Sequence, residues 1–122
     1  MACLLGIAAG VGEELLFRGI FQWELGQRLA SWVPGLAGGG SNAVAIVFSS
    51  LVFGALHGVT AWYAILATLA SLYFGYLYVA TGNLAVPIIC HGLYDIGALL
   101  YAHWTVSRFS PLEQKKISEW EG

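Results

Sequence analysis

The sequence predicts an all-α, polytopic membrane protein with about four transmembrane helices. The chain has 122 residues, of which 58% are hydrophobic and only 10% are charged, and its mean hydropathy is +0.73. Soluble domains usually contain roughly 45–50% apolar and about 25% charged residues, so this composition belongs in a bilayer. At about 20 residues for each spanning helix, the length allows one domain with roughly four spans. Four apolar segments, separated by turn or loop signals, supply them.

The first two apolar segments are separated by a strong helix breaker. The first segment runs from about Cys3 to Leu29 and is interrupted by charged residues. The glycine-rich stretch 34–42 follows it and predicts a loop. The second segment, from Ala43 to His57, is just long enough to cross a bilayer if it continues to Val59. We therefore expect two helices joined by an irregular connection.

The third and fourth segments are the clearest transmembrane helices. The stretch 62–80 has no ionisable side chain apart from its tyrosines, and the turn signal 81–83 ends it. The stretch 84–104 opens with Pro87 in its first turn, where the missing N–H costs least. We expect one membrane-embedded domain over residues 1–108.

Residues 109–122 form a polar C-terminal tail that we expect to lie outside the bilayer. Arg108, Lys115 and Lys116 near and within it outnumber Arg28 beside the first loop, so the positive-inside bias predicts a cytoplasmic tail. The net charge is −2 with only five Lys and Arg residues in the chain, which argues against nucleic acid as a partner. The sequence leaves the oligomeric state open.

Ionisable side chains within the apolar segments are the candidate functional residues. Glu13, Glu14, Arg18 and Asp95 would together cost roughly 10 kcal/mol at mid-bilayer if they had no partners. Glu14 and Arg18 stand four residues apart and can pair on one helix, which suits either site support or a structural packing role. Glu13 is rotated by about 100° from Glu14 and needs a partner on another helix, a metal or a cavity. We interpret Glu13 as the reactive carboxylate and Glu14 as its support.

Two histidines extend this polar set to other helices. His57 ends the second segment, and His91 and Asp95 stand four residues apart on one face of the fourth. Imidazole and carboxylate together either bind a divalent metal such as zinc with an open position or activate water by general-base catalysis. Glu13 completes the candidate metal ligands, and these residue types suit a metal-free mechanism equally well. His103 has no ionisable neighbour at helical spacing, so we expect it to be a packing residue.

Three motifs in this chain resemble those of the CAAX protease and bacteriocin-processing family, also called Abi. Residues 13–18 (EELLFR) are similar to its EExxxR motif, residues 53–57 (FGALH) to its FxxxH motif, and residues 91–95 (HGLYD) to its HxxxN/D-type motif. The resemblance covers about residues 10–104, and the motifs occur in the family's order. It implies an all-helical intramembrane endopeptidase whose substrate is a membrane-associated peptide or protein, including prenylated CAAX-type proteins. Bacterial relatives are linked to peptide maturation or bacteriocin immunity.

The resemblance also implies roles for individual residues. Glu13 would activate water together with His57, while His91 and residue 95 would bind and stabilise the developing oxyanion. Glu14, Arg18 and Phe53 would support the site. Position 95 is Asp where the prenyl-protein proteases of the family have Asn, and an ionised Asp would repel an oxyanion. Asp95 would therefore act protonated, orient His91 or ligate a metal.

Two other classes of protein are compatible with these residues. A non-catalytic membrane immunity or peptide-binding protein could retain the fold and use the polar groups for packing. A small transporter or channel subunit could use them as an ion relay, although it would need polar residues recurring along a helix face. Geometry separates the first of these alternatives from an enzyme: a packing role predicts that His57 and His91 lie apart, each satisfied locally, whereas catalysis requires them to converge near Glu13.

Overall fold

The computed structural model describes residues 1–119, and this part of the chain is helical without β-strands. A π-helix, η1, continues the first α-helix, and a short 3-10 helix, η2, precedes the third. The elements in chain order are α1 (Ala2–Glu14), η1 (Leu15–Gln22), α2 (Trp23–Trp32), η2 (Pro34–Leu36), α3 (Gly40–Leu56), α4 (Ala61–Thr81), α5 (Ala85–Val106) and α6 (Pro111–Ser118).

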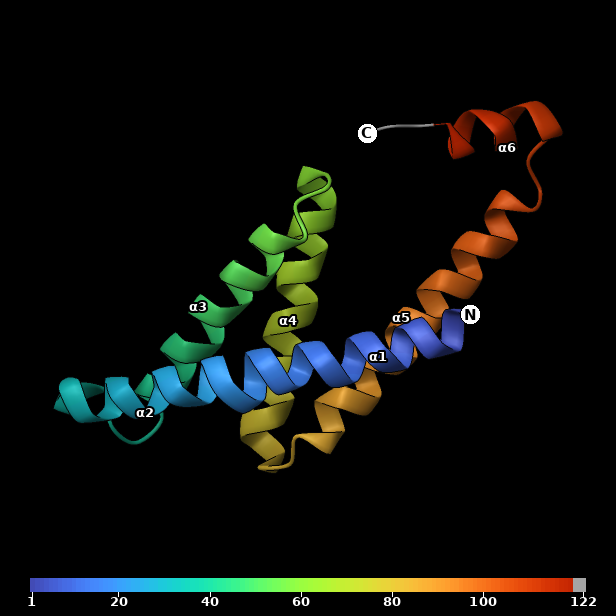
Figure 1. Ribbon diagram of the computed structural model, residues 1–122. Helices are drawn as coiled ribbons and strands as arrows, with labels where there is room; N and C mark the ends of the chain where they lie inside the picture. The colour runs from blue at the N-terminus through green and yellow to red at the C-terminus, as the bar shows by residue number, and fades with distance from the viewer. Residues whose placement is uncertain (120–122) are drawn as a thin grey trace.

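The helices α3, α4 and α5 form two hairpins that share α4, and one long helical segment crosses them. Figure 1 shows α1, η1 and α2 following one another almost continuously and passing across α4 and α5 at a steep angle. The helix α3 packs against α4, and α4 packs against α5, each pair joined by a short connection. At one end of the long segment α1 packs on α5, and at the other end α2 packs on α3. The middle of this segment therefore lies where the two hairpins meet.

The π-helix within the first segment differs from the uninterrupted helix that the sequence predicts. Its hydrogen bonds close wider turns than those of an α-helix, so more than 3.6 residues complete each turn. In an α-helix, residues four apart drift by about 40° around the axis, and the wider turn reduces this drift. Glu14, Arg18 and Gln22 consequently stay in one buried row, with 0%, 0% and 3% of their surfaces exposed. The first segment thus presents a continuous polar row to the interior.

The connections follow the glycines, with one correction to the predicted loop. The irregular stretch between the first two segments ends earlier than expected, because α3 already begins at Gly40. Gly38 and Gly39 have φ angles of 79° and 124°, which L-residues rarely adopt, and they complete the reversal within two residues. The predicted turn after the third segment is confirmed, since Gly82 ends α4 in the left-handed conformation.

Polar side chains fill much of the interior, and apolar side chains cover much of the outside. Within the described residues, eight polar or charged side chains are buried, against five buried hydrophobic ones. Large apolar residues such as Leu4, Leu56 and Trp62 are at least 70% exposed. Water would oppose such a surface, whereas a bilayer favours it. The distribution suits a membrane protein.

Two helices of the described residues are long and apolar enough to cross a bilayer, α4 and α5. The helix α3 is apolar but has only 17 residues, and the first segment is divided among α1, η1 and α2. The third and fourth predicted spans thus correspond to candidate spans. The count of four remains a prediction.

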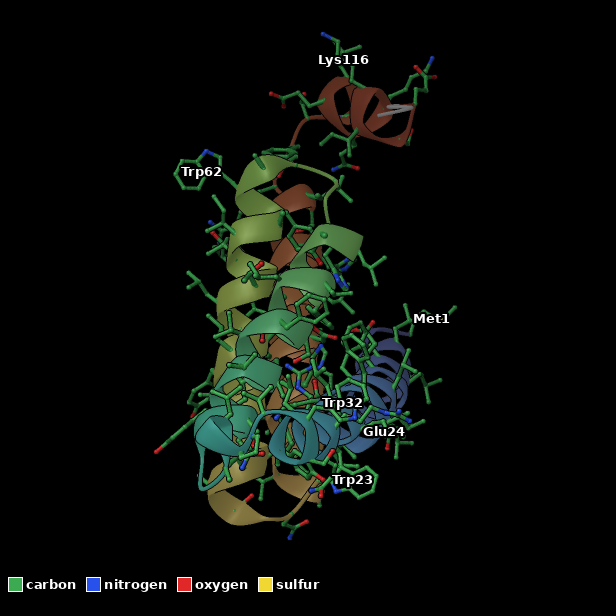
Figure 2. The ribbon with its side chains drawn as sticks, turned by 90° about the vertical axis from the view of Figure 1, so that its left-hand side faces the viewer. Met1, Trp23, Glu24, Trp32, Trp62 and Lys116 are labelled. Carbon is green, nitrogen blue, oxygen red and sulfur yellow. The ribbon has the colours of Figure 1, made fainter. Side chains whose placement is uncertain are left out.

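The tail contains a short helix that the sequence reading did not anticipate. Ser110 begins α6 with a capping box. Its hydroxyl and its backbone N–H both donate to the Glu113 carboxylate, and its hydroxyl oxygen accepts from the Glu113 backbone N–H. These hydrogen bonds lower the pKa of the exposed Glu113 carboxyl. Figure 1 shows α6 beyond the end of α5, and Figure 2 places Lys116 beyond the end of α4 that carries Trp62.

Candidate active site

The two adjacent glutamates of α1 face different environments. Glu14 is fully buried, and its Oε2 lies 3.1 Å from Arg18 Nε in an ion pair whose angles fall short of a good hydrogen bond. Glu13 leaves 34% of its side chain exposed and opens into a pocket. The rotation of about 100° between neighbours explains the difference. Glu14 belongs to the buried row, while Glu13 is the carboxylate that borders the pocket.

Glu14 also fixes the orientation of His91 on α5. His91 Nδ1 lies 2.7 Å from Glu14 Oε1, and the His91 side chain is only 6% exposed. A carboxylate accepts hydrogen bonds, so Nδ1 carries a proton and donates it to Glu14. The opposite ring nitrogen, Nε2, then points toward the pocket, 3.8 Å from Glu13 Oε2. Glu14 therefore determines which nitrogen His91 presents to the pocket.

His57 presents the same nitrogen to the same oxygen from another element. It follows α3 as its C-terminal cap, where its Nδ1 lies 2.8 Å from the Phe53 carbonyl oxygen and donates to it. Its Nε2 lies 3.7 Å from Glu13 Oε2. The motif spacing of four residues is what places the imidazole over the last turn of its own helix. His103, by contrast, is exposed and has no contact with this group.

Asp95 completes a group of facing acceptors. Its Oδ2 lies 3.4 Å from His91 Nε2, one turn away on α5, and its side chain is 25% exposed. Three carboxyl groups, Glu13, Glu14 and Asp95, lie in this group, and Arg18 pairs with Glu14. If all three were ionised and both imidazoles neutral, the group would carry an excess of two negative charges. Facing lone pairs repel one another, so protons or a cation must lie between them.

Aromatic rings hold both imidazoles in place. The ring of Phe53 stacks on His57 with centroids 4.2 Å apart, and the ring of Phe74 stacks on His91 with centroids 4.8 Å apart. The Arg18 guanidinium carbon lies 5.5 Å from the Phe53 ring centre and 5.8 Å from that of Phe74. Both phenylalanines are 4% exposed. Stacking on both imidazoles restricts their rotation about the side-chain bonds.

The converging groups line a cavity of about 140 Å³. Its polar wall consists of Glu13, His57, His91 and Asp95, together with the tyrosines 63 and 94. The apolar side chains that complete it are Phe53, Leu66, Ala67, Ala70 and Phe74. A larger apolar hollow of about 460 Å³ borders η1 and α2 and shares no residue with this cavity. The candidate catalytic side chains thus line the smaller cavity.

The donor atoms fit a divalent metal in chemistry and charge. Two imidazole Nε2 atoms and the carboxylates of Glu13 and Asp95 are the ligand types that zinc takes, and each histidine donates its other N–H to an oxygen, as metal ligands do. A dication would neutralise the two excess negative charges. Ligands bound at about 2.0–2.1 Å stand roughly 3.4 Å apart in a tetrahedron, against the 3.4–3.8 Å found here. No three such side chains among residues 1–119 are arranged as a ready-made metal site, so the group would draw together on binding.

Three contacts of this site escaped the sequence reading. Phe74 stacks on His91, Ser71 accepts a hydrogen bond from Arg18, and Gln22 bonds α4 one turn further along. Ser71 and Gln22 each carried a signal, because a polar side chain within an otherwise apolar segment needs a partner. Phe74 carried none, since one phenylalanine among many apolar residues of a spanning helix is unremarkable in sequence.

A protein-family model supports the motif evidence. The model described as type II CAAX prenyl endopeptidase Rce1-like matches residues 1–97, which include all three motifs. No curated protein and no solved structure gives a significant match. The family implies a protease that acts on membrane-associated peptides. With four-fifths of its length matched, the chain belongs to the Rce1-like family of type II CAAX prenyl endopeptidases.

Proposed function

We propose that this protein is an intramembrane endopeptidase that hydrolyses a peptide bond of a membrane-associated substrate, with a prenylated CAAX-type peptide as the first candidate. The observation that carries the proposal is the convergence of two imidazoles on one carboxylate oxygen. His57 Nε2 and His91 Nε2 lie 3.7 and 3.8 Å from Glu13 Oε2, although the three residues come from different parts of the chain. A packing role would leave the two histidines apart, whereas here both Nε2 atoms face Glu13.

Glu13 and His57 would activate the attacking water. Their facing atoms are both acceptors, because the His57 proton is held on Nδ1 by the Phe53 carbonyl. At 3.7 Å they are too far apart for a direct hydrogen bond, and a water between them can donate one proton to each. The oxygen of that water then attacks the scissile carbonyl carbon while Glu13 takes its proton. Glu13 returns the proton to the departing amine.

His91 and Asp95 would stabilise the oxyanion that forms on the former carbonyl oxygen. Nε2 of His91 becomes a donor when the ring carries a second proton, and Glu14 on the opposite side favours that charge. Asp95 is 3.4 Å from the same nitrogen and can orient it or, when protonated, donate a hydrogen bond itself. Arg18 pairs with Glu14 at 3.1 Å and so holds this carboxylate in place beside His91.

A divalent metal held by His57, His91, Glu13 and Asp95 would polarise the carbonyl and the attacking water. In that case the Nδ1 contacts to Phe53 and Glu14 orient the imidazoles as ligands. The same side chains thus support either mechanism.

The decisive test compares Glu13→Gln with Glu24→Gln. Glu24 is an exposed glutamate that pairs with Arg28 at 2.6 Å on α2, away from the cavity, so it controls for the loss of a helical carboxylate. We expect wild type and Glu24→Gln to cleave a synthetic prenylated peptide in detergent, and Glu13→Gln to lose about 10²–10⁴-fold in kcat, as for removal of a general base. Turnover by Glu13→Gln at the wild-type rate would refute the assignment.

Metal analysis of the same preparations separates the two mechanisms. Stoichiometric zinc that disappears in His57→Ala, with activity lost on chelation and restored by zinc, would establish a metalloprotease. Full activity without metal would establish the Glu13/His57 water mechanism. Peptide binding without cleavage by a folded wild-type protein would instead favour a non-catalytic immunity or peptide-binding protein.

A further inference from the structure

The helix α4 contributes a buried serine to the polar row of the first segment. Arg18 donates from one terminal nitrogen to both the backbone carbonyl of Ser71, at 2.6 Å, and the Ser71 hydroxyl oxygen, at 2.8 Å. Arg18 and Ser71 are both fully buried. Two hydrogen bonds from a buried guanidinium to one residue fix its position better than either alone, because both donor directions are then constrained.

A second contact one turn further along reinforces this junction. Gln22 Nε2 donates to the Gly75 carbonyl oxygen at 3.2 Å, and the Ser49 hydroxyl lies 3.5 Å from Gln22 Oε1. Gln22 follows Arg18 by four residues on η1, and Gly75 follows Ser71 by four residues on α4, so the two contacts have the same spacing on both helices. A methyl group on Gly75 would come within 2.7 Å of the Gln22 side-chain oxygen, so the Gln22 side chain would have to shift from its present position. The π-helix and α4 are therefore locked in one register.

From Ser71 the contacts lead directly to the cavity. Arg18 Nε lies 3.1 Å from Glu14 Oε2, and Glu14 Oε1 accepts from His91 Nδ1 at 2.7 Å. Phe74, one turn from Ser71 on α4, stacks on a face of the His91 ring. Every member of this series is buried. In a dry interior such a series holds its geometry, since no water competes for its hydrogen bonds.

We propose that Ser71 is a positioning residue of the peptidase reaction, which acts through Arg18 and Glu14 to hold the His91 ring with its Nδ1 against Glu14 and its Nε2 directed into the cavity. The proposal rests on the proposed function, in which His91 stabilises the oxyanion. Ser71 touches no substrate. We expect the loss of Ser71 to change the rate of the chemical step and the ring-nitrogen signals of His91.

The experiment uses Ser71→Ala with Ser50→Ala as the matched control. Ser50 is equally buried, on α3, and its hydroxyl oxygen has no hydrogen-bond partner among the described residues. Both substitutions remove one hydroxyl from a fully buried site. The contact of Arg18 with the Ser71 carbonyl survives in Ser71→Ala, so we expect a partial effect. If Ser71→Ala fails to fold, Ser71→Cys serves instead, because sulfur is a similar size and a weaker acceptor.

Nitrogen-15 labelling of histidine provides a readout that does not depend on activity. The chain has three histidines, and His57 and His103 serve as internal references because neither contacts Glu14. In Ser71→Ala we expect the His91 ring-nitrogen signals to shift while those of His57 and His103 stay, and kcat to fall by roughly 10–100-fold at a nearly unchanged KM. In Ser50→Ala both readouts should match wild type.

Unchanged His91 signals in a folded Ser71→Ala protein would overturn the positioning role, and so would an equal loss of kcat in Ser50→Ala. Inactive wild-type protein would refute the proposed function instead. The His91 spectrum would still report on the contacts between Ser71, Arg18 and Glu14 in that event, so the two failures can be told apart.

Discussion

At the scale of single residues, the site depends on which lone pairs face one another. The second nitrogen of each histidine is already committed, to the Phe53 carbonyl for His57 and to Glu14 for His91. The nitrogens left over, with Glu13 and Asp95, form a cluster of acceptors that must share protons or a cation. This arrangement of acceptors is the feature on which the proposed proton transfer or metal binding depends.

Position 95 offers the sharpest residue-scale prediction, through Asp95→Asn and Asp95→Ala. An amide keeps the size of the side chain, and its NH₂ group can donate either to His91 Nε2, which lies 3.4 Å from Asp95 Oδ2 in the wild type, or to an oxyanion. We expect Asp95→Asn to retain kcat within about tenfold and Asp95→Ala to lose roughly 10²-fold, the usual cost of removing one oxyanion donor. Steady-state peptidase kinetics decide this.

The two variants also separate the roles of Asp95. If Asp95→Asn is as impaired as Asp95→Ala and loses bound metal, then the carboxylate is a ligand and its charge is essential. Full activity of both Asp95→Asn and Asp95→Ala would exclude a role for Asp95 in the reaction.

At the scale of elements, the crossing of α1 and α5 sets the distance between the carboxylates and His91. A methyl group on Gly10 would meet backbone atoms of Ile88 and Gly92 at 2.8–3.0 Å, so the two helices would have to move apart. Gly12, on the same helix, has open space where its side chain would be. This pair of glycines allows a matched substitution.

We expect Gly10→Ala to destabilise the protein by about 1–3 kcal/mol, the usual range for overpacking, and to lower activity. The reason is that α1 carries Glu13 and Glu14, whereas α5 carries His91 and Asp95, so a wider crossing lengthens their contacts. Gly12→Ala should resemble wild type in both respects. Thermal unfolding in detergent and peptidase assays provide the measurements, and equal behaviour of the two variants would show that the crossing tolerates expansion.

The sequence predicts most elements well and the interior less well. The third and fourth segments could be predicted to within two residues at each end, because α4 and α5 are largely apolar and a clear turn signal separates them. The π-helix could not be foreseen, since nothing in Leu15–Gln22 distinguishes it from an α-helix without its contacts to α4. The sequence predicts too late a start for α3. Gly38 and Gly39 break the chain, but the next glycine, Gly40, is already helical.

Similar reasons divide the site into a predictable and an unpredictable part. Charged residues in an apolar chain stand out, so Glu13, Glu14, His91 and Asp95 could be singled out from composition and spacing. Contacts between distant segments have no such signal. The 53-residue separation of Arg18 from Ser71 is an example, since only the register of η1 against α4 brings them together.

At the scale of the whole molecule, polar residues inside and apolar residues outside indicate that lipid is the solvent of this fold. The helix α4 has 21 residues and α5 has 22. At 1.5 Å for each residue they reach about 30 Å, the thickness of the hydrocarbon layer. Figure 1 shows that the chain runs along α4 in one direction and returns along α5, so the turn between them lies at the opposite end from α6.

This arrangement predicts the sidedness of three connections. Thr60 before α4 and Ser118 at the end of α6 should lie on one side of the membrane, and Asn83 between α4 and α5 on the other. Lys115 and Lys116 in α6 predict that the first side is cytoplasmic. Single cysteines at the three positions, in a background with Cys3 and Cys90 replaced, can be labelled with a membrane-impermeant maleimide in right-side-out and inverted vesicles. Thr60→Cys and Ser118→Cys should react together in inverted vesicles, and Asn83→Cys in the opposite preparation. Reaction of all three from one side would mean that α4 and α5 enter and leave the bilayer without crossing it, and the cavity would then lie near the membrane surface.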